Sequence, residues 1–358
     1  MSIDQDDLRA GIAAGIISEE QASRLQTLTQ SRAGLRDAMP ADEEQFELFR
    51  GFSEIFISVG LTILMIGLTT VTSITGALII GPIVTCILAI LFANYFTIKR
   101  RMALPSITIT IAFTCAFYLL VEIILDKFWL QLGDIYGTTI GSLIITFALI
   151  IWYYRYKIPF TMFLIGLLAL VIITTLTNTI KPADISLNLT NNSTNIFNLS
   201  NESSLAYGTL LFGIAAFITA MLFDMKDPHR LGRFSASAFW LHLLAAPALV
   251  NTIAMTFAQM GSGIGYFFLT LTLVAVTLIA LIIDRRSFLT AGIAYFGFLI
   301  SLLLRGDTGF YSNIGQFAWT FILLGGFITI IGAFWTQARR YILLNLPEFP
   351  GKHRLPPY

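Results

Sequence analysis

The sequence predicts an all-α membrane protein, a polytopic bundle of about ten transmembrane helices with both termini in the cytoplasm and a small cytoplasmic helical region at the N-terminus. The first observation is composition: 56% of the 358 residues are apolar and only 12% are charged. A soluble domain carries about 25% charged residues, so these charges are too few to cover a water-facing surface. The other two observations are the long apolar blocks and the distribution of lysine and arginine between them.

Ten blocks of the sequence are long and apolar enough to cross a membrane, which takes roughly 20 residues for about 30 Å of hydrocarbon. Among the aspartate, glutamate, lysine and arginine residues, only Glu122 lies inside one of them. Each block is expected to be helical, because an open strand would leave backbone groups unpaired in lipid. The blocks are 55–74, 77–98, 104–125, 135–154, 158–178, 205–223, 235–257, 264–283, 287–304 and 314–336.

Basic residues alternate between the segments that connect these blocks. With a cytoplasmic N-terminus, 14 of the 22 lysines and arginines fall in the segments that face inward. Only Lys127, Lys181 and Arg305 fall in the outward segments, and the remaining five lie in the N-terminal region. Positive charge stays on the cytoplasmic side of membranes, so this alternation predicts the orientation and favours ten spans over nine or eleven.

The first 50 residues form an acidic cytoplasmic region, with ten acidic residues and five arginines. We expect a helix near 4–14, a turn at Gly15, and a second helix from about residue 19 with Ser18 as its N-cap. A third helix is expected over 42–54, leading into the first block. Fifty residues bury little core alone, so this region is expected to pack on the bundle, on a cytoplasmic partner protein or on another copy of the chain.

The transmembrane domain, residues 51–340, can be divided into two halves of five blocks by the outer loop 179–204. An odd-numbered unit that is duplicated in a membrane comes out inverted, as in many secondary transporters. Residues 341–358 form a cytoplasmic tail that contains prolines and is expected to be irregular at its end.

Three polar residues inside the blocks are candidates for an intramembrane site: His242, Asn251 and Glu122. His242 is either a proton-relay or ligand residue, as ionisable groups in membranes often are, or a neutral imidazole that hydrogen-bonds a neighbouring helix. Asn251 lies nine residues later on the opposite face of the same helix. Glu122 either faces a polar cavity or lies at the membrane interface, and its neighbours Asp126 and Lys127 favour the interface.

Two inward turns are rich in charge. The first contains Asp224, Asp227, Arg230 and Arg233, and the second contains Asp284 and Arg285. We expect these residues to contact lipid headgroups and fix the topology, with Asp284 as the N-cap of the ninth span. Two arginines oppose a cation in the first turn, and its spacing fits no defined metal site.

No catalytic, metal or nucleotide motif is present in the sequence. The absence of a Walker motif, an HExxH motif and a CxxC motif lowers the expectation of ATP-driven transport and zinc proteolysis. A net charge of +1 offers no field for nucleic acid. We therefore expect neither a catalytic residue nor a cofactor or metal, and the lipid bilayer is the partner that the composition predicts.

The stretch from Gly11 to Ala22, GIAAGIISEEQA, resembles the start of bacterial membrane proteins that share the domain of unknown function 2157. The strings FWLHLLAAP, from Phe239 to Pro247, and Asp284-Arg285-Arg286 resemble uncharacterised proteobacterial inner-membrane proteins. This resemblance implies a multi-pass protein of the bacterial inner membrane and implies no activity.

Two classes of function follow from these observations. One is a secondary transporter or channel for a small solute, which the possible five-plus-five arrangement favours. The other is a membrane-embedded sensor, scaffold or assembly factor that recruits a partner through the N-terminal helices.

Overall fold

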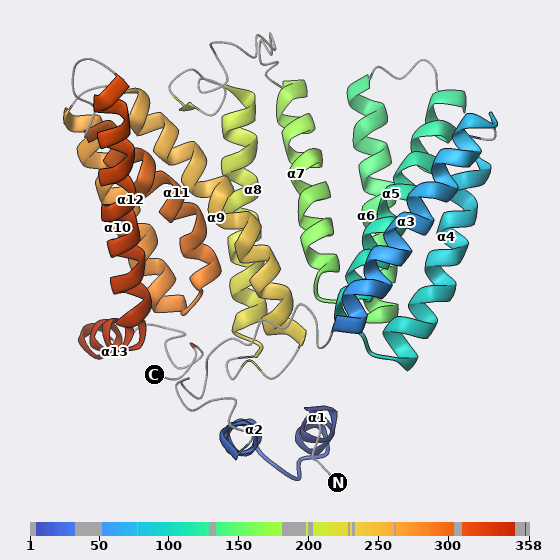
Figure 1. Cartoon of the computed structure of the whole chain (residues 1–358), viewed down its shortest axis with the longest axis horizontal. Helices are drawn as coiled ribbons and strands as arrows, with labels where there is room; N and C mark the ends of the chain where they lie inside the picture. The colour runs from blue at the N-terminus through green and yellow to red at the C-terminus, as the bar shows by residue number, and fades with distance from the viewer. Residues whose placement is uncertain are drawn as a thin grey trace. The chain divides into compact units, whose positions relative to one another are not determined.

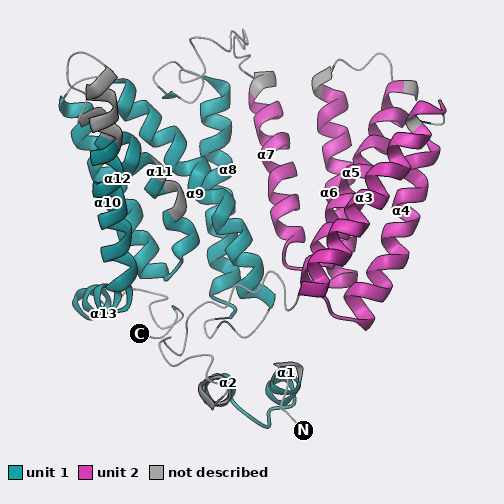
Figure 2. Ribbon diagram, in the orientation of Figure 1, with its two compact units in different colours: residues 1–43, 180–358 teal, residues 44–179 magenta. Residues whose placement is uncertain are grey.

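A computed structural model describes residues 5–32, 52–76, 78–128, 134–180, 198–199, 203–227, 230, 233–260, 263–303, 310–347 and 355. Within these ranges every long regular element is a helix (Figure 1). The chain divides into two compact units, residues 44–179 and residues 180–358 together with 1–43 (Figure 2). The boundary therefore falls at the start of the loop that separates the fifth apolar block from the sixth.

The N-terminal region forms a helical hairpin of α1 (Gln5–Ala13) and α2 (Glu19–Arg32). Gly15 has a φ of 69° in the turn between them, as the sequence predicts. The Ser18 hydroxyl accepts the backbone N–H of Gln21 at 3.2 Å, and the Gln21 side chain accepts the N–H of Ser18 at 2.9 Å. This capping box confirms the predicted start of α2. Most of the third helix expected over 42–54 lies outside the described residues.

The 44–179 unit contains five of the predicted blocks as helices. They are α3 (Phe52–Ile74), α4 (Ile80–Phe92) with its π-helical continuation η1 (Ala93–Lys99), α5 (Ala103–Phe128), α6 (Asp134–Tyr156) and α7 (Thr161–Ile180). Their core is built around Ile109, Phe113, Ile145, Leu149 and Trp152. Trp152 stacks on Phe113, with ring centroids 4.2 Å apart, and donates its indole N–H to the Thr110 hydroxyl.

The 180–358 part contains the other five blocks and one further helix. They are α8 (Ser204–Asp224), α9 (Arg233–Gln259), α10 (Gly263–Ile283), α11 (Arg286–Leu303), α12 (Phe310–Ala333) and α13 (Trp335–Asn345). The tenth block was expected to end at residue 336. Instead α12 ends at Ala333, and the helix axis bends by 66° into α13. Helix continues to Asn345, and most of the proline-containing tail that was expected to be irregular lies outside the described residues.

Seven of the described helices are long and apolar enough to cross a membrane, or eight if α12 and α13 count as one bent span. All ten predicted blocks are helical, but helix length and composition support only seven or eight membrane spans. Helix α7 has only a shorter apolar part, Thr161–Thr177. Seven such helices indicate a multi-pass membrane protein.

The distribution of side chains agrees with lipid as the surrounding solvent. Large apolar side chains lie on the outside of the helices, such as Ile63 at 67% exposure and Phe147 at 66%. Small and hydroxyl-bearing residues lie inside, including Ser58, Thr110 and Ser142. A water-soluble bundle has the opposite pattern, whereas membrane helices pack through small residues and interhelical hydrogen bonds.

Among the described residues, four turns contain a residue other than glycine with a left-handed backbone conformation. These residues are Arg101, Lys157, Arg230 and Asp284, with φ between 52° and 57°. Asp284 shows how the conformation arises, because it follows α10 in a Schellman arrangement. The N–H of Arg285 bonds to the carbonyl of Ala280 at 3.0 Å, and the N–H of Asp284 to that of Leu281 at 3.3 Å. Glycine is the usual residue at such a position.

Helices α8 and α9 form the most extensive of the described helix pairs. Small residues line their contact, among them Gly213, Ala216 and Ala245, and the hydroxyls of Thr209 and Thr252 hydrogen-bond across it at 2.8 Å. A Cβ on Gly213 would lie 2.7 Å from Leu249 Cγ and 3.1 Å from the Leu249 backbone nitrogen. The pair can therefore approach this closely only where no side chain intervenes.

The substitution Gly213→Ala is expected to lower the free energy of unfolding by about 1–3 kcal/mol, because the helices have to move apart. Thermal unfolding of the purified protein in detergent would measure it. Gly67→Ala is the matched control, since Gly67 is also helical and nothing lies within 4 Å of its Cβ position. That control should be neutral or slightly stabilising, since alanine has the higher helix propensity. Equal melting temperatures for the two variants would contradict the close α8–α9 contact.

Candidate functional site

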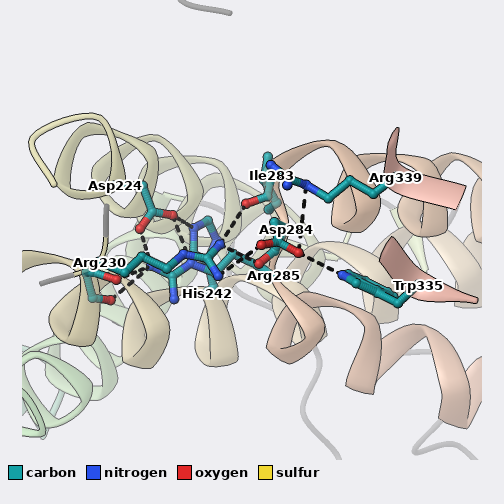
Figure 3. A network of polar contacts seen from close by, with 9 residues as sticks. Asp224, Arg230, His242, Ile283, Asp284, Arg285, Trp335 and Arg339 are labelled. Atoms are coloured by element: carbon teal, nitrogen blue, oxygen red, sulfur yellow. Dashed lines mark hydrogen bonds and ion pairs between the residues drawn. The ribbon is translucent and has the colours of Figure 1, made fainter. Parts of the chain in front are cut away.

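A network of charged side chains lies at one end of the 180–358 helices (Figure 3). It joins the end of α8, the first turns of α9, the α10–α11 turn and the start of α13. Its ion pairs form two clusters, one around Asp224 and one around Asp284. Because Asp284 and Arg285 are adjacent in the chain, the two clusters share the α10–α11 turn.

In the first cluster, the Asp224 carboxylate binds both His242 and Arg285. The His242 Nε2 lies 2.9 Å from Asp224 Oδ2, and the Arg285 Nε donates to the same oxygen at 3.1 Å. The Arg285 Nη2 donates to Asp224 Oδ1, which makes the pair bidentate. His242 and Arg285 are both 0% exposed. We call these three residues the buried triad.

Ser235 orients the arginine of the buried triad. Arg285 Nη2 donates to the Ser235 carbonyl at 3.0 Å and to its hydroxyl at 2.9 Å. Ser235 and His242 are seven residues apart on α9, so they lie on one face of that helix and both point toward the end of α8 and the α10–α11 turn. Burial lowers the pKa of the Arg285 guanidinium to about 9, so the residue is still charged at neutral pH.

The contacts of His242 define its tautomer. An ionised carboxylate only accepts hydrogen bonds, so Nε2 carries the hydrogen and donates it to Asp224. The Nδ1 atom is buried and has no hydrogen-bond partner among the described residues. Phe217 and Phe288 pack edge-on against the ring at centroid distances of 5.7 and 6.1 Å. The ring therefore presents one nitrogen to Asp224 and holds the other in apolar surroundings.

In the second cluster, the Asp284 carboxylate holds side chains from two other elements. It accepts the indole N–H of Trp335 at 2.7 Å, and it pairs with Arg230 at 3.1 Å and with Arg339 at 3.8 Å. Arg230 also donates to the Asp284 carbonyl at 2.6 Å. The predicted role of Asp284 as the N-cap of α11 is therefore wrong, because its side chain turns to α13 and to the α8–α9 turn instead.

The structure brings together four of the residues that the sequence singled out in the charged turns, namely Asp224, Arg230, Asp284 and Arg285. It adds His242 to them, which the sequence grouped with Asn251 and Glu122. His242 joins the turns because it lies at the tenth position of α9, where it is level with the end of the antiparallel α8. Helix α9 runs antiparallel to α8 and begins beyond its end, so a residue near the third turn of α9 lies beside the last turn of α8.

Of the other candidates, Asp227 lies beside the first cluster, whereas Asn251, Glu122 and Arg233 have contacts elsewhere. Asn251 is further along α9 and accepts a hydrogen bond from the Tyr295 hydroxyl on α11. Glu122 is in the 44–179 unit, where its Oε1 is buried beside Gly141 and has no hydrogen-bond partner among the described residues. Asp227 accepts the backbone N–H of Ser235 at 3.4 Å, and the Arg233 guanidinium lies 5.3 Å from the centre of the Phe234 ring.

Two residues of the network were not identified as site residues from the sequence. Trp335 has the position of an interfacial aromatic residue, and Arg339 that of a residue fixing topology. Their common signal is spacing, because positions four apart share one face of a helix. That signal requires α13 to be recognised as a separate helix, which the continuous apolar run does not reveal.

A second set of polar contacts was also not predicted, at the π-helical η1 of the 44–179 unit. The Tyr156 hydroxyl lies 3.4 Å from Asn94 Oδ1, and the Thr97 hydroxyl donates to Ser106 at 2.9 Å. Irregular turns of this kind recur at functional sites, but here the polar groups satisfy one another.

The network has the chemistry of proton handling rather than of metal binding. It contains two aspartates, three arginines and one imidazole with a free acceptor nitrogen. Arginine guanidinium groups occupy the carboxylates that a cation would need. The described residues contain no group of three or more His, Cys, Asp or Glu residues that could hold a metal ion.

Comparison of the chain with known protein families, curated proteins and solved structures gives no match.

Proposed function

We propose that this chain is a proton-coupled secondary transporter of a small solute, in a bacterial inner membrane, with ten spans and both termini in the cytoplasm. The alternation of basic residues supports the orientation. In each unit the helix ends that carry exposed cations, such as Lys99 and Arg155 or Lys226 and Arg286, are those assigned to the inner side. The division into 44–179 and 180–358, with five predicted spans on each side, is the arrangement expected of paired five-helix units.

The single observation that carries the proposal is the buried triad. Ionisable groups enclosed within or beside a membrane are energetically costly and are usually functional. This triad joins α8 and α9 to the α10–α11 turn, so a change in its charge acts on the packing of all three elements.

Protonation of His242 supplies that change. A proton that enters from the water and binds Nδ1 converts the imidazole into a cation. Asp224 then faces two buried cations, His242 and Arg285, and one carboxylate cannot compensate both in a low-dielectric environment. The other charged groups near Asp224 are Arg230, which adds to the excess of positive charge, and Asp227, which opposes it. Protonation therefore favours separation of the α8–α9 pair from the α10–α11 turn.

Uptake by purified protein in liposomes, with an imposed pH gradient and a panel of labelled sugars, amino acids and organic acids, tests the proposal. We expect one class of solute to accumulate and a protonophore to abolish the accumulation. Asp224→Asn should reduce uptake to background. His242→Gln should lose proton-driven accumulation but keep solute exchange at equal pH, because glutamine retains a donor yet cannot take up a proton.

Asp126→Asn is the matched control, since it makes the same change on an exposed position outside the network. It should transport like the unmodified chain. Failure of every solute to move, or unchanged proton coupling in His242→Gln, would refute the proposal. Failure of every solute would favour the second class, a sensor or scaffold, for which the α1–α2 hairpin offers an exposed Ile16 at 78% and Leu25 at 38%.

A further inference from the structure

Helix α13 is too short to cross a membrane and is not needed for crossing. It has 11 residues, which is about 17 Å of helix, whereas the 24 residues of α12 already extend about 36 Å. The 66° bend at Phe334 turns α13 away from the axis of α12 (Figure 1). If α12 crosses the bilayer, α13 therefore runs along the inner surface of the membrane.

One face of α13 is fixed to the helices of its own unit. Trp335, Arg339 and Leu343 are spaced four residues apart and are all buried. Trp335 and Arg339 bind the Asp284 carboxylate at 2.7 and 3.8 Å. This attachment to the α10–α11 turn fixes the rotation of the helix about its own axis, so its opposite face points outward in a defined direction.

The outward face has two flanks, and the large apolar side chains are gathered on one of them. Phe334, Tyr341 and Leu344 are exposed by 58%, 73% and 63%, and they lie within one side of the helix. Thr336 and Arg340 are exposed on the other side, and the polar residues Gln337 and Asn345 are exposed among the apolar residues. A short helix with this division of residues is typical of helices that lie in the membrane–water interface.

The charge around α13 is positive. The helix contains two arginines and no acidic residue. Arg340 is exposed, and so is Arg286, whose guanidinium lies 5.6 Å from the centre of the Trp335 ring. Asp284, the acidic residue that binds α13, is already paired with Arg230 and Arg339. Exposed arginines next to an interfacial helix suit the phosphate of an anionic lipid.

We propose that α13 is an interfacial helix that binds anionic phospholipid headgroups through Arg340 and Arg286, with Phe334, Tyr341 and Leu344 against the acyl-chain boundary. The inference depends on the chain being a membrane protein but not on its being a transporter. Because α13 is attached to Asp284, and Asp284 adjoins Arg285, the bound lipid is linked through two adjacent residues to the buried triad.

The depth of α13 can be measured with a fluorophore on single cysteines, in full-length protein whose Cys86 and Cys115 are replaced by alanine. Tyr341→Cys and Thr336→Cys place the label on the two flanks. In lipid nanodiscs, we expect acyl-chain nitroxide lipids to quench the label at 341 and aqueous iodide to quench the label at 336. Quenching of both labels by iodide would refute the interfacial position. Shielding of 341 from both quenchers would mean that a protein, such as a second copy, covers this flank.

The choice of headgroup is tested separately by titrating the labelled Tyr341→Cys protein with short-chain phosphatidylglycerol and, in parallel, phosphatidylcholine. We expect a response to the anionic lipid alone. Arg340→Gln should weaken its apparent affinity roughly fivefold, the effect of about one cation near an anionic surface. Lys226→Gln is the matched control, because it removes one exposed cation from the same end of the unit without touching α13. Equal affinities in the two variants, or equal responses to the two lipids, would refute the headgroup site.

Discussion

Replacement of Asp224 by alanine is expected to lower the free energy of unfolding by about 3–5 kcal/mol, the usual effect of removing one member of a buried ion pair. Arg285 would remain fully buried without its carboxylate, and the Nε2–H of His242 would lose its acceptor. With an unfolding entropy of about 2.1 cal/mol/K per residue, the melting temperature of a chain of this size should fall by roughly 4–7 °C. Thermal unfolding in detergent, followed by circular dichroism, measures the change.

Two comparisons show whether the loss comes from the unpaired arginine. Asp126→Ala removes a carboxylate at an exposed position and should change the melting temperature little. The double variant Asp224→Leu, Arg285→Leu removes both charges, and apolar replacement of a whole buried pair is often close to neutral. It should therefore recover most of the lost stability. A double variant no more stable than Asp224→Ala would contradict the ion pair as the cause.

Replacement of Asp284 by alanine is expected to release α13 before it affects the rest of the bundle. The change removes the acceptor of the Trp335 indole and the anionic partner of Arg339, while Arg230 keeps its bond to the Asp284 backbone carbonyl. We expect a loss of about 3 kcal/mol, since unsatisfied buried groups cost about 1–3 kcal/mol each. Hydrogen exchange should show faster exchange over Trp335–Asn345 and little change in α8 and α9.

Trp335→Phe is a milder variant that tests one contact of Asp284 alone. It removes one hydrogen bond and keeps the aromatic packing and both arginine contacts, so about 1 kcal/mol is expected. Uniformly faster exchange across α8, α9 and α13 in Asp284→Ala would show that Asp284 supports the whole unit rather than the attachment of α13.

The helices could be predicted from the sequence because lipid offers no hydrogen-bond partners to the backbone. In lipid, every apolar block has to satisfy its backbone hydrogen bonds internally, so the ten blocks are also ten helices. The ends of helices depend on short-range hydrogen bonds. The start of α2 could therefore be predicted from the Ser18 capping box. The sequence does not predict the break between α12 and α13, because the apolar run continues through Phe334 to Trp335 without proline, and Gly332 is a residue type that is common inside membrane helices.

The candidate site was predictable only in its parts. Asp224, His242 and Arg285 each stand out as polar residues in or beside apolar blocks. Their meeting depends on the packing register of α8 against α9 and on the direction of the α10–α11 turn, and 61 residues separate Asp224 from Arg285. No periodicity connects such positions. Trp335 and Arg339 were assigned other roles for the same reason, since their shared acceptor lies more than 50 residues away in sequence.

At the left-handed turn residues, the most stable backbone and the correct membrane orientation favour different residue types. Glycine would relieve about 1 kcal/mol of backbone strain at each turn. Arg101, Lys157 and Arg230 carry a cation there instead. On the proposed topology, each of these cations helps the insertion machinery to retain the correct side of the nascent chain in the cytoplasm. The folded protein therefore retains backbone strain at these positions, because the cation that causes it is needed while the chain is inserted into the membrane.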